Sequence, residues 1–211
     1  MSTQQYGFMI DTARCTGCKT CQLSCKDYKD LPVDVNFRRV YEYVGGEWLP
    51  EGEGKNQVWR QEVFAYYTSI ACNHCADPAC VKVCPSGAMH KREDNGLVIV
   101  NEDVCIGCKS CAMACPYGAP QFNAKKGHMT KCDGCHERVS QGLKPVCVAS
   151  CPLRALDFGP IEELRAKYGE LAAIAPLPAA NYTTPSLVVQ PNAKARPAGD
   201  NSGFLGNPRE V

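Results

Sequence analysis

Sixteen cysteines are the residues of this sequence best suited to chemistry. They stand in a chain of 211 residues, and an ordinary cytosolic enzyme carries far fewer. Cysteine thiolates form disulfides and bind soft metals, so three kinds of centre compete: a disulfide framework, zinc sites and iron–sulfur clusters. The spacing of the cysteines decides among them.

The cysteines form four groups of four, with none left over. Groups I and III read Cys-x2-Cys-x2-Cys-x3-Cys, whereas the second gap widens to four residues in group II and to eleven in group IV. A proline follows the last cysteine of groups II, III and IV, so the pattern is an internal repeat. The groups are Cys15, Cys18, Cys21 and Cys25 (I), Cys72, Cys75, Cys80 and Cys84 (II), Cys105, Cys108, Cys111 and Cys115 (III), and Cys132, Cys135, Cys147 and Cys151 (IV).

Regular cysteine triplets favour iron–sulfur clusters. Three cysteines on a tight loop can hold three corners of a cubane, and the fourth, before a proline, ligates the neighbouring cluster in two-cluster ferredoxins. Gly17, Gly107 and Gly134 lie between the first two cysteines of their groups, where a small residue lets the backbone approach closely; group II has His74 there. Zinc remains an alternative for group IV alone, because tetrahedral zinc sites use close pairs rather than triplets.

Reciprocal ligation predicts which groups pair. Groups II and III are close in sequence and are expected to form one two-cluster unit, so groups I and IV pair around it. The expected ligand sets, for four [4Fe-4S] clusters, are Cys15, Cys18, Cys21 and Cys151 (cluster 1), Cys25, Cys132, Cys135 and Cys147 (cluster 2), Cys72, Cys75, Cys80 and Cys115 (cluster 3), and Cys84, Cys105, Cys108 and Cys111 (cluster 4).

Other chemically active residues receive simpler interpretations. All four cysteine sets are complete, so no histidine is needed as an iron ligand, and no phosphate loop or Ser/His/Asp set stands out. Trp48 and Trp59 are interpreted as core or interface residues. Five lysines lie in or beside the groups and are either solvated or, together, expected to raise cluster potentials by balancing the negative charge of the clusters: Lys19, Lys26, Lys82, Lys109 and Lys131.

The elements that position the cysteines are short. Strands are predicted at 37–43, 58–70 and 97–100, with a glycine-rich loop at 45–54. Helical spacing begins at Ile161, and prolines recur after Ala175, which predicts a disordered tail or an arm extended on a partner. The expected fold class is α+β: tandem bacterial ferredoxin-like units, with residues 1–60 and 126–160 forming one, 61–125 the inserted other, and a helix plus C-terminal arm at 161–211.

Composition excludes several classes of protein. The formal net charge is +1, which disfavours a broad basic surface for nucleic acid. No apolar run approaches the roughly 18–20 residues that span a bilayer. The N-terminal segment from Met1 to Arg14 lacks the apolar stretch of a secretory signal peptide. Without a signal of its own, eight disulfides are not expected.

The order of the groups and their widened gaps resemble the electron-transfer subunits of complex iron–sulfur molybdoenzymes, in particular the iron–sulfur B subunits of anaerobic dimethyl sulfoxide reductases. The resemblance covers essentially the whole chain, including the proline-rich tail. The segments that carry it are 6–8, 15–21, 37–39, 84–93, 127–135 and 151–160. Related nitrate reductase subunits have tryptophan at the place of Cys108, where they hold a three-iron cluster, so cysteine here predicts a four-iron cluster.

The resemblance implies a non-catalytic subunit of a three-part complex used in anaerobic respiration. An integral membrane anchor would oxidise quinol, this chain would pass the electrons on, and a molybdopterin catalytic subunit would reduce dimethyl sulfoxide and other S- or N-oxides. The group I/IV pair would lie nearer the catalytic subunit and the group II/III pair nearer the membrane. Membrane association would come only through the anchor, on a side that the sequence leaves open.

Two alternatives stay open. The chain could serve a related reductase of polysulfide, thiosulfate or arsenate, because substrate choice belongs to the catalytic subunit. It could also be a free-standing soluble polyferredoxin. The tail is expected to distinguish a subunit from a free carrier, since an arm that lies on partners becomes ordered on binding.

Overall fold

The first strand, β1 (Tyr6–Asp11), is the centre of a three-stranded sheet in the order β10-β1-β11. The structure is a computed structural model that describes residues 4–211; residues 1–3, which begin the segment considered above for a signal peptide, lie outside the described residues. β1 pairs antiparallel with β10 (Leu156–Pro160) and parallel with β11 (Leu187–Gln190). Helix α6 (Ile161–Tyr168) packs against this sheet.

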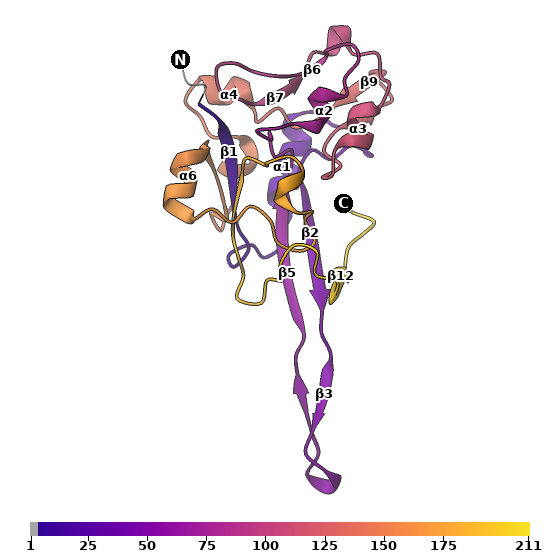
Figure 1. Cartoon of the computed structure of the whole chain (residues 1–211), viewed down its shortest axis with the longest axis vertical. Coiled ribbons are helices and arrows are strands. Elements are labelled where there is room, and N and C mark those ends of the chain that lie inside the picture. The colour runs from indigo at the N-terminus through magenta and orange to yellow at the C-terminus, as the bar shows by residue number, and fades with distance from the viewer. Residues whose placement is uncertain (1–3) are drawn as a thin grey trace.

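A long antiparallel ribbon is formed by β2 (Arg39–Gly45) and β5 (Phe64–Ile70). It continues into the hairpin of β3 (Trp48–Glu51) and β4 (Val58–Gln61), which projects far from the rest of the chain (Figure 1). The predicted strand at 58–70 is therefore two strands, and the expected loop at 45–54 contains β3. Trp48 and Trp59 are 58% and 62% exposed on this hairpin, so neither is a core residue.

Two small hairpins and four short helices surround the cysteine groups. The predicted strand at 97–100 is confirmed as β7 (Val98–Val100), which pairs with β6 (Met89–Lys91); β8 (Gln121–Asn123) pairs with β9 (His128–Thr130). Helix α1 (Thr20–Tyr28) packs against α5 (Val146–Ala149), and α2 (Ala79–Lys82) against α3 (Ser110–Ala114). The remaining helical segments are α4 (His136–Ser140) and the 3₁₀ turns 54–56, 102–104 and 180–182.

Shared strands and a shared core connect the two expected units, residues 1–60 with 126–160 and residues 61–125. The expected boundary at 60/61 falls inside β4, and the β2–β5 ribbon links a strand before it to a strand after it. One buried core contains residues of both expected units, including Phe8, Val40, Tyr66 and Leu97. The cysteine groups therefore share a common framework.

The C-terminal segment folds back onto the chain itself. In β11 the side chains of Leu187, Val188 and Val189 are at most 1% exposed. Farther on, β12 (Gly203–Leu205) pairs with β2 and extends the ribbon. In the structure the tail is therefore ordered on the chain itself rather than disordered, and that it also lies on a partner stays a prediction.

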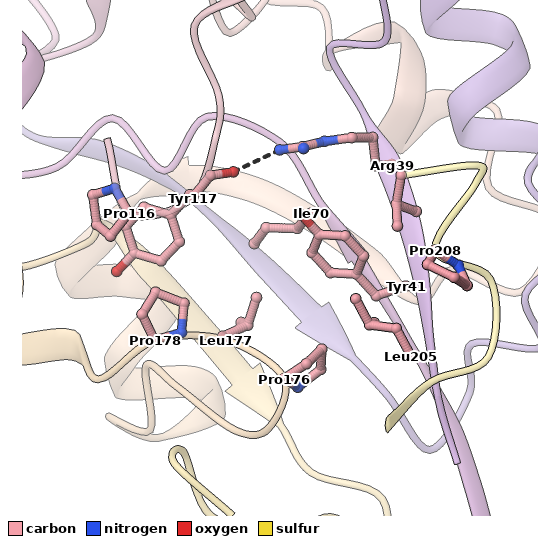
Figure 2. Close-up of a pocket in the computed structure, with 11 residues that line it drawn as sticks. Arg39, Tyr41, Ile70, Pro116, Tyr117, Pro176, Leu177, Pro178, Leu205 and Pro208 are labelled. Carbon is pink, nitrogen blue, oxygen red and sulfur yellow. Dashed lines mark hydrogen bonds between the residues drawn. The ribbon is translucent and has the colours of Figure 1, made fainter. Parts of the chain in front are cut away.

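The prolines of this tail still shape it, as the sequence predicts, because they keep its strands short. Pro176, Pro178 and Pro208 line a pocket where the tail crosses β2 and β5 (Figure 2). Within the described residues, no helix is both long enough and apolar enough to cross a membrane.

Candidate iron–sulfur sites

The structure gathers cysteines from distant groups into two cavities. One is lined by Cys15, Cys18, Cys21 and Cys151. The other is lined by four more, Cys84, Cys105, Cys108 and Cys111. These are the sets expected for clusters 1 and 4. Among the described residues, no group of three or more Cys, His, Asp or Glu is close enough to hold a single metal ion.

The other two expected sets are buried neighbours. The thiol of Cys25 lies in the electrostatic range of Cys147 and Cys135, and that of Cys132 in the range of Cys25 and Cys135. These four form the set expected for cluster 2. The remaining set is joined in the same way, because Cys72 and Cys115 both act on Cys75 and on Cys80.

Electrostatic and packing neighbours link the four sets in the order of clusters 1, 2, 3 and 4. Cys21 of the first set lies near Cys147 of the second, and Cys132 of the second lies near Cys72 of the third. Cys80 of the third set and Cys111 of the fourth share one buried cluster. In the structure all sixteen cysteines are free thiols.

The exposure of the cysteines also changes along the series from the first set to the fourth. Cys18 of the first set and Cys108 of the fourth are exposed. The second set is fully buried, and the third is buried or half-buried. The series of cysteine sets therefore reaches the surface at its two ends and is enclosed in between.

The two exposed cysteines have matching surroundings, because they occupy equivalent positions of the repeat. The hydroxyl of Thr20 lies 3.4 Å from the sulfur of Cys18, and that of Ser110 lies 3.4 Å from the sulfur of Cys108. In both cases this hydrogen bond lowers the pKa of the thiol. A hydroxyl that donates to sulfur favours the thiolate, which is the form that binds iron.

Left-handed backbone recurs in the cysteine loops. The residue before the second cysteine has a φ of +72° at Gly17, +67° at Gly107 and +69° at Gly134. His74 takes the equivalent place in group II with a φ of +43°. A Cβ at Gly17 would lie 2.5 Å from the ring of Tyr67, so space as well as backbone conformation requires glycine there.

Backbone N–H groups point at cysteine sulfurs. Gly134 N donates to Cys132 Sγ at 3.4 Å, and His74 N donates to Cys72 Sγ at 3.5 Å. Ala155 N donates to Cys151 Sγ at 3.3 Å. Such donors stabilise the negative charge of thiolates and sulfides in iron–sulfur sites.

Burial keeps most of the inner thiols protonated in the absence of a metal. It raises the pKa of Cys25, Cys75 and Cys80 to about 12 each. These thiols bind iron as thiolates, and metal binding then releases their protons. The donor set is soft and anionic, which suits iron–sulfur clusters.

A buried cation, which the sequence does not predict, lies near cysteines of groups I and IV. Arg38 is 1% exposed, and among the described residues its Nε and Nη2 atoms have no hydrogen-bond partner. A buried charge without a partner is costly. The orphaned donors fit a site that gains negative charge when clusters are present, so the residues fit the group that the spacing predicts.

The sequence analysis assigned His74 no role beyond the expectation that it does not ligate iron. In the structure His74 contacts two cysteines. Its ring is fully buried, and Nδ1 accepts a hydrogen bond from Val98 N at 3.0 Å. The ring proton of the neutral tautomer therefore lies on Nε2, which is 3.9 Å from Cys132 Sγ. The residue thus contacts Cys72 through its backbone and Cys132 through its ring.

The lysines near the cysteines differ among themselves. Lys131 is 4% exposed and donates to the carbonyls of Val98 and Cys132. The other four are held by surface partners or backbone carbonyls: Lys19 by Glu210, Lys82 by Asp77, Lys26 by the carbonyls of residues 32, 33 and 35, and Lys109 over the ring of Phe122. Lys131 is thus the buried member of the five.

The pocket beside the tail offers no comparable chemistry. Figure 2 shows apolar and proline side chains around it, with Arg39 donating to the carbonyl of Tyr117 at 2.6 Å. The described residues that line it carry no carboxylate, imidazole or thiol side chain. The cysteine sets remain the candidate functional site.

Comparisons with known proteins identify the same chemistry. Residues 63–161 match a family model described as a 4Fe-4S dicluster domain, and residues 12–29 match one described as a 4Fe-4S binding domain. These matches support [4Fe-4S] clusters as cofactors, and the cysteine count is consistent with four.

Curated relatives extend over the whole chain. The chain is 69% identical over 209 residues to the B subunit of anaerobic dimethyl sulfoxide reductase from Escherichia coli, covering 99% of this chain and all of that protein. It is 67% identical over 208 residues to the corresponding subunit of Haemophilus influenzae, with the same coverage. A thiosulfate reductase electron transfer subunit of Salmonella typhi is 36% identical over 162 residues, which are 76% of this chain and 79% of that protein. The chain belongs to the family of anaerobic dimethyl sulfoxide reductase B subunits, which are iron–sulfur electron-transfer subunits and not catalytic ones.

Proposed function

We propose that the chain holds four [4Fe-4S] clusters and carries electrons in single file between two partner subunits. The sixteen cysteines would ligate them in the sets expected from the sequence, with groups I and IV in one ferredoxin-like unit and groups II and III in the other. Each cluster would accept and release single electrons. The chain's own residues hold the thiolates, shield the inner sets from water and leave the outer sets accessible.

The observation that carries this proposal is the accessibility of the cysteines. Cys18 and Cys108 are exposed at the two ends, whereas the sets between them are enclosed. An electron carrier between two partners needs an accessible centre for each partner and protected centres in between. A store of iron or a structural zinc protein has no need of that order.

The partners of this proposal are a molybdopterin catalytic subunit and an integral membrane anchor that oxidises quinol. The set that contains Cys18 would face the catalytic subunit, and the set that contains Cys108 would face the anchor. The terminal acceptor would be dimethyl sulfoxide or another S- or N-oxide, as the names of the Escherichia coli and Haemophilus influenzae relatives suggest. The chain would reach the membrane only through the anchor.

The test compares two electron donors in the assembled three-part complex. Quinol must deliver its electrons through this chain, whereas a small reduced dye can reach the catalytic subunit directly. A complex assembled with a Cys18→Ser or Cys108→Ser variant is expected to lose much of its quinol-driven sulfoxide reduction and to retain the dye-driven reaction. Equal quinol-driven rates in a complex that lacks this chain would refute the proposal.

A further inference from the structure

The guanidinium of Arg38 is buried between two cysteine sets. It donates through Nη1 to the carbonyl of Ser69 at 3.0 Å and to the hydroxyl of Ser69 at 3.2 Å. The same hydroxyl lies 3.2 Å from Cys21 Sγ. Because the Ser69 oxygen accepts from Arg38, its own proton is free to donate to a Cys21 thiolate.

The charges that face Arg38 are sulfurs. The groups that act on its charge are Cys147, Cys21, Cys132 and Cys25. Burial acts to lower the pKa of the guanidinium, whereas these four cysteines raise it once they are ionised, as they are when they bind iron. Its Cζ atom lies 4.7 Å from the centre of the buried Phe8 ring.

Other side chains do not neutralise this cation. Among the described residues Arg38 has no carboxylate within ion-pair distance, and Nε and Nη2 are unsatisfied. The neighbouring Arg39 differs in this respect, because its Nη2 donates to the Tyr117 carbonyl. A cation retained in such a place needs anions that are absent from the polypeptide alone.

We propose that Arg38 is the fixed counter-charge of the two clusters held by groups I and IV, and that it raises the reduction potentials of both. The inference deepens the proposed function and rests on it. One-electron reduction makes a cluster with four thiolate ligands more negative by one charge, while Arg38 remains protonated throughout. The cation therefore stabilises the reduced form of these two clusters more than the oxidised form.

The experiment is a potentiometric titration of the anaerobically purified full chain, followed by electron paramagnetic resonance. Arg38→Met removes the charge while keeping a long side chain, and Arg38→Lys retains a positive charge without the planar guanidinium. The expected result is that Arg38→Met lowers two of the four midpoint potentials and leaves the other two unchanged, with Arg38→Lys closer to the wild type. Arg60→Met, on the projecting hairpin with a side chain 57% exposed, is the matched control.

The iron content of each protein distinguishes a failure of the proposed function from a failure of the role of Arg38. Wild-type protein without clusters would overturn the proposed function itself. Loaded Arg38→Met protein with four unchanged potentials would overturn only the role of Arg38. Loss of the group I/IV clusters in Arg38→Met but not in Arg38→Lys would support the need for a counter-charge, whereas their loss in both variants would contradict it, because the shape of the guanidinium would then matter rather than its charge.

Discussion

Val188 provides a direct test of how the C-terminal segment is held. Its side chain is 0% exposed and packs with Met9, Ile161 and Leu164 under helix α6. Replacing Val188 by alanine removes two buried methyl groups, each worth about 0.8 kcal/mol, and leaves a small cavity. We expect Val188→Ala to cost about 2 kcal/mol of folding free energy.

The matched control is Val33→Ala, since Val33 is 92% exposed in the loop before β2. A change at an exposed site is expected to stay within about 0.5 kcal/mol. For a chain of this length, the difference corresponds to a melting temperature roughly 4–8 °C lower for Val188→Ala. The assay is thermal unfolding followed by circular dichroism, on anaerobic protein of equal iron content.

Equal melting temperatures for the two variants would refute the reasoning. They would mean that β11 does not pack against β1 in solution, and that the tail is disordered or extended on a partner, as the proline pattern predicts. A large loss at Val188 alone would establish that residues 187–190 belong to the body of the protein.

Three further predictions concern single side chains. Cys108→Ser is expected to convert one cluster to a three-iron form with its own resonance signal, and an unchanged spectrum would contradict the ligand set. His74→Asn keeps a residue type that tolerates left-handed backbone but is too short to reach Cys132; we expect it to lower one midpoint potential, because hydrogen bonds to sulfur raise it. Burial alone would raise the pKa of Asp157, but Lys144, at 2.9 Å, and other donors hold that pKa below its usual 3.8. This carboxylate therefore contributes stability above about pH 4 that is lost as the pH falls through its folded pKa, so the melting temperatures of wild type and Asp157→Asn should converge toward acid pH, and a constant gap would contradict the ion pair.

The sequence predicts the iron–sulfur chemistry well because cluster ligands stand at regular intervals along the chain. Cysteines at fixed intervals predict the clusters, and the positive φ of Gly17 and Gly107 agrees with the glycine that stands before the second cysteine. The strand at 97–100 is also predicted, because its β-branched residues favour extended backbone, and it is present as β7. Each of these features is local, so neighbouring residues suffice to encode it.

Long-range features are harder to predict. The β3 strand lies in a glycine-rich segment that is typical of a loop, and it forms because β4 pairs with it. The tail resembles an unstructured arm because its prolines exclude long elements, yet four residues without proline are enough for β11. Parallel pairing of β11 with β1 joins positions about as far apart as the chain allows.

Arg38 and His74 were missed for the same reason. Nothing in the sequence around Arg38 indicates that it is buried, and an arginine within a predicted strand is usually solvated. His74 occupies a glycine position of the repeat, and the sequence alone does not explain this departure. Their roles depend on cysteines from other groups, which the fold alone brings within reach.

The measurement that tests the central claim most directly is the iron and acid-labile sulfide content of the anaerobically purified chain, combined with a redox titration followed by electron paramagnetic resonance. The account predicts about sixteen iron and sixteen sulfide atoms per chain and four reduction steps. A folded protein with about half that iron, or with zinc in its place, would contradict it.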